Sequence, residues 1–376
     1  MKIRQIDLSV NPDVNKFILF PFKLYKGSKQ WVPPLISSEL KKLDPANHPY
    51  YRHSSAEFYL LEDQRGNPLG RIALLHNTRY NKYRKENAGL FGFFDVIEDE
   101  KAANILLETA EEWGNKKGFT KLIGPKGLIT TELGGILVEG FDHRAALNIN
   151  YNYAYYPKYL EKAGFQKERD SLSGYIHVPS AVLPQRVQNI AKKVIEKRGF
   201  YIKSFQTKDE MRAMVGQAQK VLHESFRDGE GYVEMTDEEF ALVAEDLITI
   251  ADPSLIKVVM HGDQIIGYLF AYHDISVGLQ RARGRLFPFG WLHLLIDQKR
   301  TTWVNVNGLG VLPEYQGKGG NAILYEALAQ TIQSKFNFEH LETIFIGEEN
   351  YRSFSDNLTL GVKWYKRHRV YYKTIG

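Results

Sequence analysis

The segment from 302 to 335 constrains the fold of this chain more than any other stretch. Val304 and Val306 alternate with polar residues near its start, which predicts a strand with one apolar face. The glycine-dense run QGKGGN follows at 316–321, and apolar residues at helical spacing begin with Ile323. A helix that starts directly after glycines presents its first N–H groups and its positive dipole end to a ligand. The pattern therefore predicts a binding site for an anion such as a phosphate.

Two common glycine loops do not fit this run. The dinucleotide fingerprint lacks its third glycine after Gly317, Gly319 and Gly320, and the Lys-Ser/Thr pair of a P-loop is absent. The run instead resembles the pyrophosphate loop R/Q-x-x-G-x-G/A of the GNAT superfamily of acyl-CoA-dependent N-acyltransferases. Gln316 and Gly319 match that loop, whereas Asn321 stands where glycine or alanine is usual. The residues alone also allow a simple strand-to-helix turn whose glycines serve backbone geometry.

The expected elements follow a similar order in both halves, which indicates an internal repeat. LEKAGFQKERDSLSGYI in the first half mirrors LTLGVKWYKRHRVYYKTI in the second. The resemblance implies an α/β (α+β) fold of two tandem GNAT-like domains, each a mixed, mostly antiparallel sheet flanked by helices. Prolines near the middle predict a boundary that gives domains 1–179 and 180–376. The first half also resembles a bacterial family of tandem proteins with a poorly defined substrate, through its WVPPL, HPYY and LVEGFD segments.

The two halves differ at the start of the corresponding helix. The first half places Glu98, Asp99 and Glu100 there, and these acids would repel an anion. The second half has glycines and Lys318 instead. We therefore expect a degenerate first domain without a pyrophosphate loop, and a second domain that binds acetyl-CoA or a longer acyl-CoA.

The resemblance also implies which residues contact the acyl-CoA. The fourth strand of the fold contributes backbone groups to the pantetheine arm, and an Asn after the fifth strand faces the cofactor. The expected set is Leu309, Val311, Gln316, Gly317, Lys318, Gly319, Gly320, Asn321 and Asn350. Asn350 has an alternative role as the N-cap of the next helix, and both roles are compatible.

Catalytic groups are harder to assign. The glutamate that many relatives use as a general base falls on Asn305, and the tyrosine used as a general acid falls on Asn357. This leaves direct attack of an amine on the thioester, helped by proximity and by a strand N–H that polarises the carbonyl. We expect Glu348 to deprotonate the amine, with Asn305 also in the site. Glu348 has the alternative of a solvated loop acid, and His273 and Glu139 are further candidates.

Composition excludes several classes of site and partner. The chain has no cysteine, so disulfides and thiolate metal sites are excluded, and its 11 histidines lack the spacing of a metal site. The net charge of +5 is dispersed, so we expect no nucleic-acid partner. No apolar run approaches ~18 residues, and no signal peptide is evident, which predicts a cytoplasmic protein.

One apolar insertion interrupts the second half, at 285–296. It concentrates Leu286, Phe287, Phe289, Trp291, Leu292, Leu294 and Leu295 in a short span. The insertion either lines a lipid channel or rests on a membrane surface beside nearby arginines. The alternatives are packing between the domains or across a homodimer interface.

These features together predict an N-acyltransferase that moves an acyl group from acyl-CoA to a small-molecule or lipid amine. Two other functions stay open. A non-catalytic acyl-CoA-binding or regulatory protein is favoured by the amides at 305 and 357. An aminoacyl-tRNA-dependent transferase is the second, because tandem GNAT-like folds also occur in that class, although it would not need the glycine loop.

Overall fold

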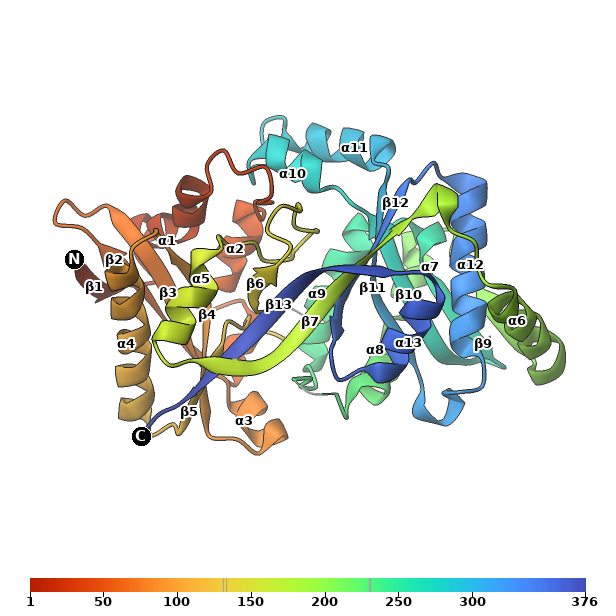
Figure 1. The fold of residues 1–376 in the computed structure, drawn as a ribbon, viewed down its shortest axis with the longest axis horizontal. Coiled ribbons are helices and arrows are strands. Elements are labelled where there is room, and N and C mark those ends of the chain that lie inside the picture. The colour runs from red at the N-terminus through yellow and green to blue at the C-terminus, as the bar shows by residue number, and fades with distance from the viewer. Residues whose placement is uncertain (131, 133, 230) are drawn as a thin grey trace. The chain divides into compact units, whose positions relative to one another are not determined.

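The structure, a computed structural model, describes residues 1–130, 132, 134–229 and 231–376. The chain forms two compact units that do not simply follow chain order (Figure 1). Unit 1 comprises Met1–Ser171, Ile275–Asp297 and Lys366–Gly376, and unit 2 comprises Leu172–Asp274 and Gln298–Tyr365. The predicted boundary between 179 and 180 divides the two sequence repeats, which is a different division from these compact units, and it stays a prediction.

Unit 1 is built on a mixed sheet in the order β1-β2-β3-β4-β5-β13, with β6 paired to β13. Its pairs are antiparallel except β4 with β5, which is parallel. The strands are β1 (Lys2–Gln5), β2 (Ser55–Glu62), β3 (Pro68–His76), β4 (Ala88–Val96), β5 (Lys121–Gly124), β6 (Ile136–Glu139), the start of β7 (Gln166–His177) and most of β13 (Lys363–Thr374).

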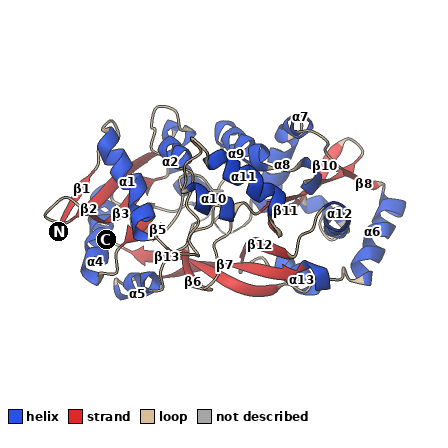
Figure 2. Ribbon diagram, turned by 90° about the horizontal axis from the view of Figure 1, so that it is seen from above, coloured by secondary structure: helices blue, strands red, loops and turns tan. Residues whose placement is uncertain are grey.

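Helices cover both faces of this sheet, with α1 and α2 on one face and α4 and α5 on the other (Figure 2). The helices of unit 1 are α1 (Asn11–Leu24), α2 (Ile36–Lys42), α3 (Thr78–Arg84), α4 (Glu100–Lys117), α5 (Tyr155–Lys162), α10 (Ser276–Ala282) and nearly all of α11 (Gly290–Arg300), and η1 (Pro49–Arg52) is a short 3-10 turn. The apolar stripe of α4, predicted from its spacing, is buried at Ala103, Leu106, Leu107 and Ala110.

The strands of unit 2 follow one another in the order β7-β12-β11-β10-β9-β8. Strands β11 and β12 are parallel, and β8 to β11 pair antiparallel in sequence. The strands are β8 (Phe200–Lys203), β9 (Lys257–His261), β10 (Gln264–His273), β11 (Trp303–Val311), β12 (His340–Gly347) and the end of β7. The predicted α/β class with a mixed, mostly antiparallel sheet is confirmed.

The helices of unit 2 pack around this sheet. They are α6 (Gln185–Arg198), α7 (Lys208–Arg212), α8 (Val215–Phe226), α9 (Asp237–Ile250), α12 (Gly320–Lys335) and α13 (Tyr351–Thr359), with short 3-10 turns η2 (Val178–Ser180), η3 (Pro253–Leu255) and η4 (Pro313–Tyr315). On β11, Gly310 faces Ser225 of α8, whereas Val311 faces Gly320 at the start of α12. Helices α8 and α12 therefore cover opposite faces of the sheet. Among the described residues, no helix is both long and apolar enough to cross a bilayer.

Candidate active site

The glycine loop ends β11 and leads into α12, as predicted. Gly317 and Gly319 have φ values of +71° and +89°, in the left-handed region that suits glycine. Gly319 occupies the N-cap position, where no side chain caps the helix, and the first helical bond runs from Ile323 N to Gly319 O at 3.3 Å. The N–H groups of Gly320, Asn321 and Ala322 precede that bond. This helix start can therefore donate hydrogen bonds to an anion.

The corresponding helix of unit 1 starts differently. Asp99 is the N-cap of α4, and its carboxylate accepts a hydrogen bond from Ala102 N at 3.0 Å. This carboxylate occupies the position that an anionic ligand would take, and its charge repels one. The contrast predicted from the acids at 98–100 is thus present in the geometry.

Three cationic side chains surround the loop of unit 2. Lys318 is exposed, with its Nζ 5.3 Å from the Tyr315 ring centre, and its carbonyl oxygen accepts from Arg198 of α6 at 2.6 Å. Arg352 of α13 donates to Oε1 of Gln316. Arg198 and Arg352 belong to no sequence motif and come from helices outside the loop segment, so the sequence pattern did not predict them here. Their positive charge favours the same anion as the helix start.

Two of the predicted loop residues have structural partners. Gln316 donates from Nε2 to Val311 O at 3.2 Å, which ties the loop to the end of β11. Asn321 donates from Nδ2 to Asp356 Oδ2 at 2.7 Å, which ties α12 to α13. The second contact gives a reason for an amide where the GNAT loop usually has glycine or alanine.

The two positive-φ glycines of the loop do different jobs. A Cβ on Gly319 would lie 2.5 Å from Val194 Cγ2 and 3.0 Å from Ile190 Cγ2, so this glycine lets α6 pack against the loop. A Cβ on Gly317 would meet no atom within 4 Å. Close packing against α6 therefore explains, in part, why position 319 is a glycine. The same reason does not apply to Gly317, which borders open space.

Strands β11 and β12 stop pairing before the chain reaches this loop. Their parallel pairing runs from Trp303 opposite His340 to Val306 opposite Thr343, although both strands continue further. On the other side, the pairing of β11 with β10 shifts register around Gly308, whose φ is +113°. Beyond Val306, this edge of β11 is not paired with β12 among the described residues. That edge is where the resemblance places the pantetheine arm.

Leu309 and Val311 lie on this part of β11. Val311 is buried at 5% exposure in the apolar core, and Leu309 packs against the same core. The Val311 side chain therefore stabilises the fold, and a ligand would meet this residue through its backbone, whereas the Leu309 side chain is only partly buried.

Asn305 is the most unusual side chain of unit 2. It is 0% exposed, and neither Nδ2 nor Oδ1 has a hydrogen-bond partner among the described residues. It pairs with Tyr272 on β10 and with Glu342 on β12, which are also buried. Burial, then the nearby charges of Asp274 and Glu342, raise the pKa of Tyr272. A row of polar side chains therefore crosses the centre of the sheet on the face that α8 covers.

The other predicted residues lie around the end of β12. Glu348 is half-buried in the turn after the strand. Asn350 caps α13, because its Oδ1 accepts from Ser353 N at 3.1 Å. Asn357 is buried and donates to Ser353 O at 2.7 Å within its own helix. The N-cap role of Asn350 is thus present, and roles of these residues toward a cofactor or substrate stay predictions.

The two further candidates for a base have structural partners. His273 Nε2 lies 3.6 Å from Asp252 Oδ2, and this histidine lowers the pKa of Asp252 to about 2. The ring of His273 also packs against Phe336 and Phe338. Glu139 belongs to unit 1, where its Oε1 lies 3.1 Å from Arg367 Nε. Both side chains are therefore engaged in contacts within the fold.

Comparison with known proteins gives two relatives and a fold. No family model matches the chain. Protein YghO from Escherichia coli (strain K12) is 26% identical over 378 residues, covering 96% of this chain and 93% of its own length. A bacterial ceramide synthase from Caulobacter vibrioides (strain NA1000 / CB15N) is 23% identical over 383 residues and 98% of both chains.

Solved structures with a similar fold include two acetyltransferase-like chains. A tandem GNAT protein from the clavulanic acid biosynthesis pathway has a TM-score of 0.56 at 12% identity and covers 100% of this chain and 98% of its own. A GCN5-related N-acetyltransferase from Sphaerobacter thermophilus has a TM-score of 0.51 at 12% identity, covering 99% of this chain and 95% of its own. At these identities the likeness concerns the fold.

Proposed function

We propose, from the tandem GNAT fold that these likenesses show, that the chain is an N-acyltransferase that uses acyl-CoA and a long-chain amine. One observation carries the proposal. The start of α12 has no side-chain cap among the described residues, and it follows a glycine loop after β11, whose pairing with β12 has already ended at Val306. The corresponding helix of unit 1 carries its own carboxylate cap, so the proposal assigns the acyl-CoA to unit 2.

The residues of unit 2 suit the parts of an acyl-CoA. The N–H groups at the start of α12, with Lys318, Arg198 and Arg352 nearby, suit the pyrophosphate. The backbone edge of β11 beyond its pairing with β12 suits the amide groups of the pantetheine arm. In the reaction, the amine nitrogen forms a bond to the thioester carbon, the carbon–sulfur bond breaks, and the thiolate leaves while a base takes the amine proton. Glu348 is proposed as that base. The amide of Asn305, which has no hydrogen-bond partner among the described residues, is proposed as a separate polar group of unit 2, because it lies opposite Glu342 on β12 and not beside Glu348.

The choice of a long-chain amine rests on one relative. A ceramide contains an amide bond between a fatty acyl chain and a long-chain amino alcohol. The relative from Caulobacter vibrioides, a bacterial ceramide synthase by name, matches this chain over 98% of both lengths. This end-to-end match supports a lipid amine as acceptor and a fatty acyl-CoA as donor.

The acyl-CoA site is tested by calorimetric titration with CoA, acetyl-CoA and palmitoyl-CoA. Gly317 is the position to change, because a side chain there meets open space, whereas a side chain on Gly319 would clash with α6. Aspartate and asparagine both tolerate the left-handed region and have similar size. We expect Gly317→Asp to weaken binding by roughly tenfold, the effect of one unfavourable charge of about 1.4 kcal/mol, and Gly317→Asn to bind nearly as the wild type does.

Turnover is tested separately, by following thiol release from palmitoyl-CoA with a long-chain amino alcohol or a small polar amine. Turnover with the long-chain amine is expected. Binding of CoA without turnover of any amine would instead favour the non-catalytic acyl-CoA-binding protein, which the amide at Asn305 supports. Absence of binding by every CoA species would contradict the proposed function.

A further inference from the structure

Large apolar side chains are exposed at the tip of unit 1 formed by residues 281–296, which we call the α10–α11 tip. Phe287 and Phe289, between the two helices, are 82% and 70% exposed. Trp291, Leu292 and Leu295 continue along α11 with exposures of 46%, 42% and 47%. Exposed apolar side chains gathered in one short segment mark a surface that contacts another molecule or a membrane.

The backbone of this tip is held in place by unit 1. Ile36 N donates to Gly284 O at 2.9 Å, and Gln280 Nε2 donates to the carbonyl oxygens of Lys29 and Trp31 at 2.9 and 2.8 Å. A Cβ on Gly290 would lie 1.6 Å from the carbonyl oxygen of Arg285, so only glycine allows this turn. The phenylalanines therefore project from an ordered support.

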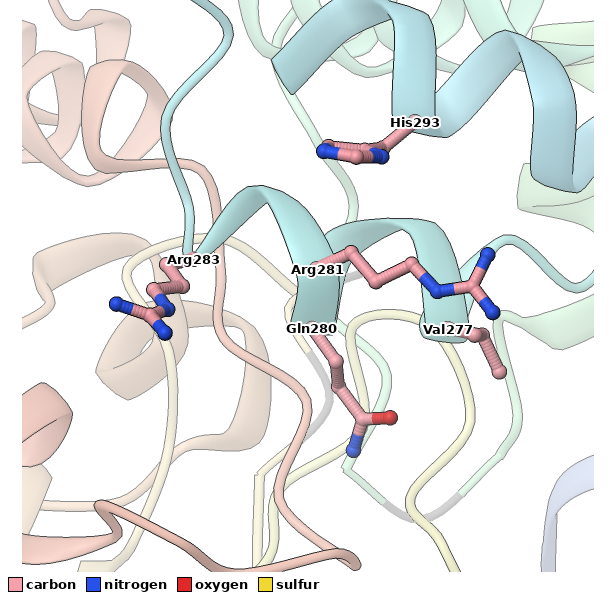
Figure 3. A pocket seen from close by; sticks show the side chains of 5 residues that line it. All are labelled: Val277, Gln280, Arg281, Arg283 and His293. Atoms are coloured by element: carbon pink, nitrogen blue, oxygen red, sulfur yellow. The ribbon is translucent and has the colours of Figure 1, made fainter. Parts of the chain in front are cut away.

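Positive charge accompanies the apolar side chains. Arg281, Arg283 and Arg285 are all exposed, and none of them forms an ion pair with any residue that the structure describes. Arg281 and Arg283 border an open hollow of about 550 Å³ between α10 and α11, which His293 also lines. Figure 3 shows the His293 ring extending from α11 into the space over α10, from which the Arg281 side chain also extends.

We propose that the α10–α11 tip docks on the surface of a membrane that contains anionic phospholipids. Phe287 and Phe289 enter the region between head groups and acyl chains, and the arginines contact the phosphates. Trp291 adds a large apolar ring to this region, and its Nε1–H donates to Pro288 O at 3.1 Å, so the donor stays paired when the ring leaves water. The inference concerns unit 1 and does not depend on the proposed acyl transfer.

A second copy of the chain is a less suitable occupant. In a two-fold dimer the same patch meets itself, so the arginines of one copy would face those of the other. Asp297 is the one acidic residue between 275 and 300, and it is buried, with Oδ2 accepting from Gly278 N at 2.7 Å. The patch thus offers no carboxylate to a second copy, whereas a lipid phosphate supplies the missing charge.

The electrostatic part is tested by flotation with vesicles of phosphatidylcholine alone or with added phosphatidylglycerol. We expect the full chain to bind the anionic vesicles, less so at high salt. The triple variant Arg281→Gln/Arg283→Gln/Arg285→Gln should bind them about 100-fold more weakly, from about fivefold for each arginine near the surface.

A control variant removes the same charge elsewhere in unit 1, with Lys41→Gln/Lys82→Gln/Lys116→Gln at exposed positions. This control should bind nearly as the wild type does. Equal loss in the control and the arginine variant would mean that net charge alone drives binding, and would overturn the proposed docking tip.

The apolar part is tested with Phe287→Ser/Phe289→Ser, which changes exposed side chains and leaves the core intact. Binding to anionic vesicles should fall strongly, while the control Val182→Ser, at a residue 81% exposed, should bind normally. Brominated lipids should quench the fluorescence of the wild type, and Trp291→Phe should remove most of that quenching. A wild-type chain that dimerises in solution through Phe287 and Phe289 and ignores vesicles would overturn the proposal in favour of self-association.

Discussion

The amide of Asn305 lies in the middle of a sheet, where a backbone ladder surrounds it and water does not reach it. A buried amide without hydrogen-bond partners costs about 1–3 kcal/mol, and a leucine, which has the same branched shape, would avoid that cost. Such groups persist where an ordered water, a ligand or the chemistry of a site uses them. Asn305 lies opposite Tyr272 on β10 and Glu342 on β12, so its amide belongs to a row of polar side chains across the sheet.

We therefore expect Asn305→Leu to raise the free energy of unfolding by about 1 kcal/mol and to lower the turnover of acyl-CoA on the order of tenfold. Urea unfolding and thiol release measure the two effects. Asn357→Leu is the matched control, because that amide donates to Ser353 O and its loss should destabilise by about 1 kcal/mol. If Asn305→Leu were as destabilising as Asn357→Leu, Asn305 would have a structural role instead.

At the scale of elements, local patterns predicted the parts of unit 2 that depend on neighbouring residues. The strand at 303–311, the loop and α12 follow from alternation, glycines and helical spacing, all within one stretch. Arg198 and Arg352 could not be predicted at the loop, because α6 and α13 reach it only through folding. For the same reason, the sequence did not predict that residues 275–297 belong to unit 1. Gln280 is held there by hydrogen bonds to residues about 250 positions earlier.

The starts of α4 and α12 allow stability and ligand binding to be tested independently. Asp99→Ala removes the cap of α4 and should lower the free energy of unfolding by about 1 kcal/mol. Affinity for CoA should not change, because the proposed site lies in unit 2. Urea unfolding and calorimetric titration of the same variant check both statements. A loss of CoA affinity together with the loss of stability would place a ligand in unit 1 and contradict the degenerate role of that unit.

At the scale of the whole molecule, the chain has two proposed binding sites, one in each unit. The start of α12 in unit 2 suits a water-soluble anionic donor, and the α10–α11 tip in unit 1 suits an anionic membrane. A long-chain amine is an amphiphile and partitions into membranes, whereas a short-chain amine stays in water. A single chain that has both sites can take a donor from water and an acceptor from a lipid surface.

The two proposals together predict that changes in the α10–α11 tip affect turnover of an amine bound in a membrane but not of an amine dissolved in water. Phe287→Ser/Phe289→Ser should lower turnover of a long-chain amine embedded in anionic vesicles, because fewer molecules of the chain lie on the surface. The same variant should turn over a short-chain, water-soluble amine at the wild-type rate, since the acyl-CoA site in unit 2 is untouched. Initial rates of thiol release at equal acyl-CoA measure both. An equal loss of turnover on both amines would mean that the phenylalanines support the fold or the reaction directly. Wild-type rates of the variant on both amines would mean that acyl transfer does not depend on membrane docking.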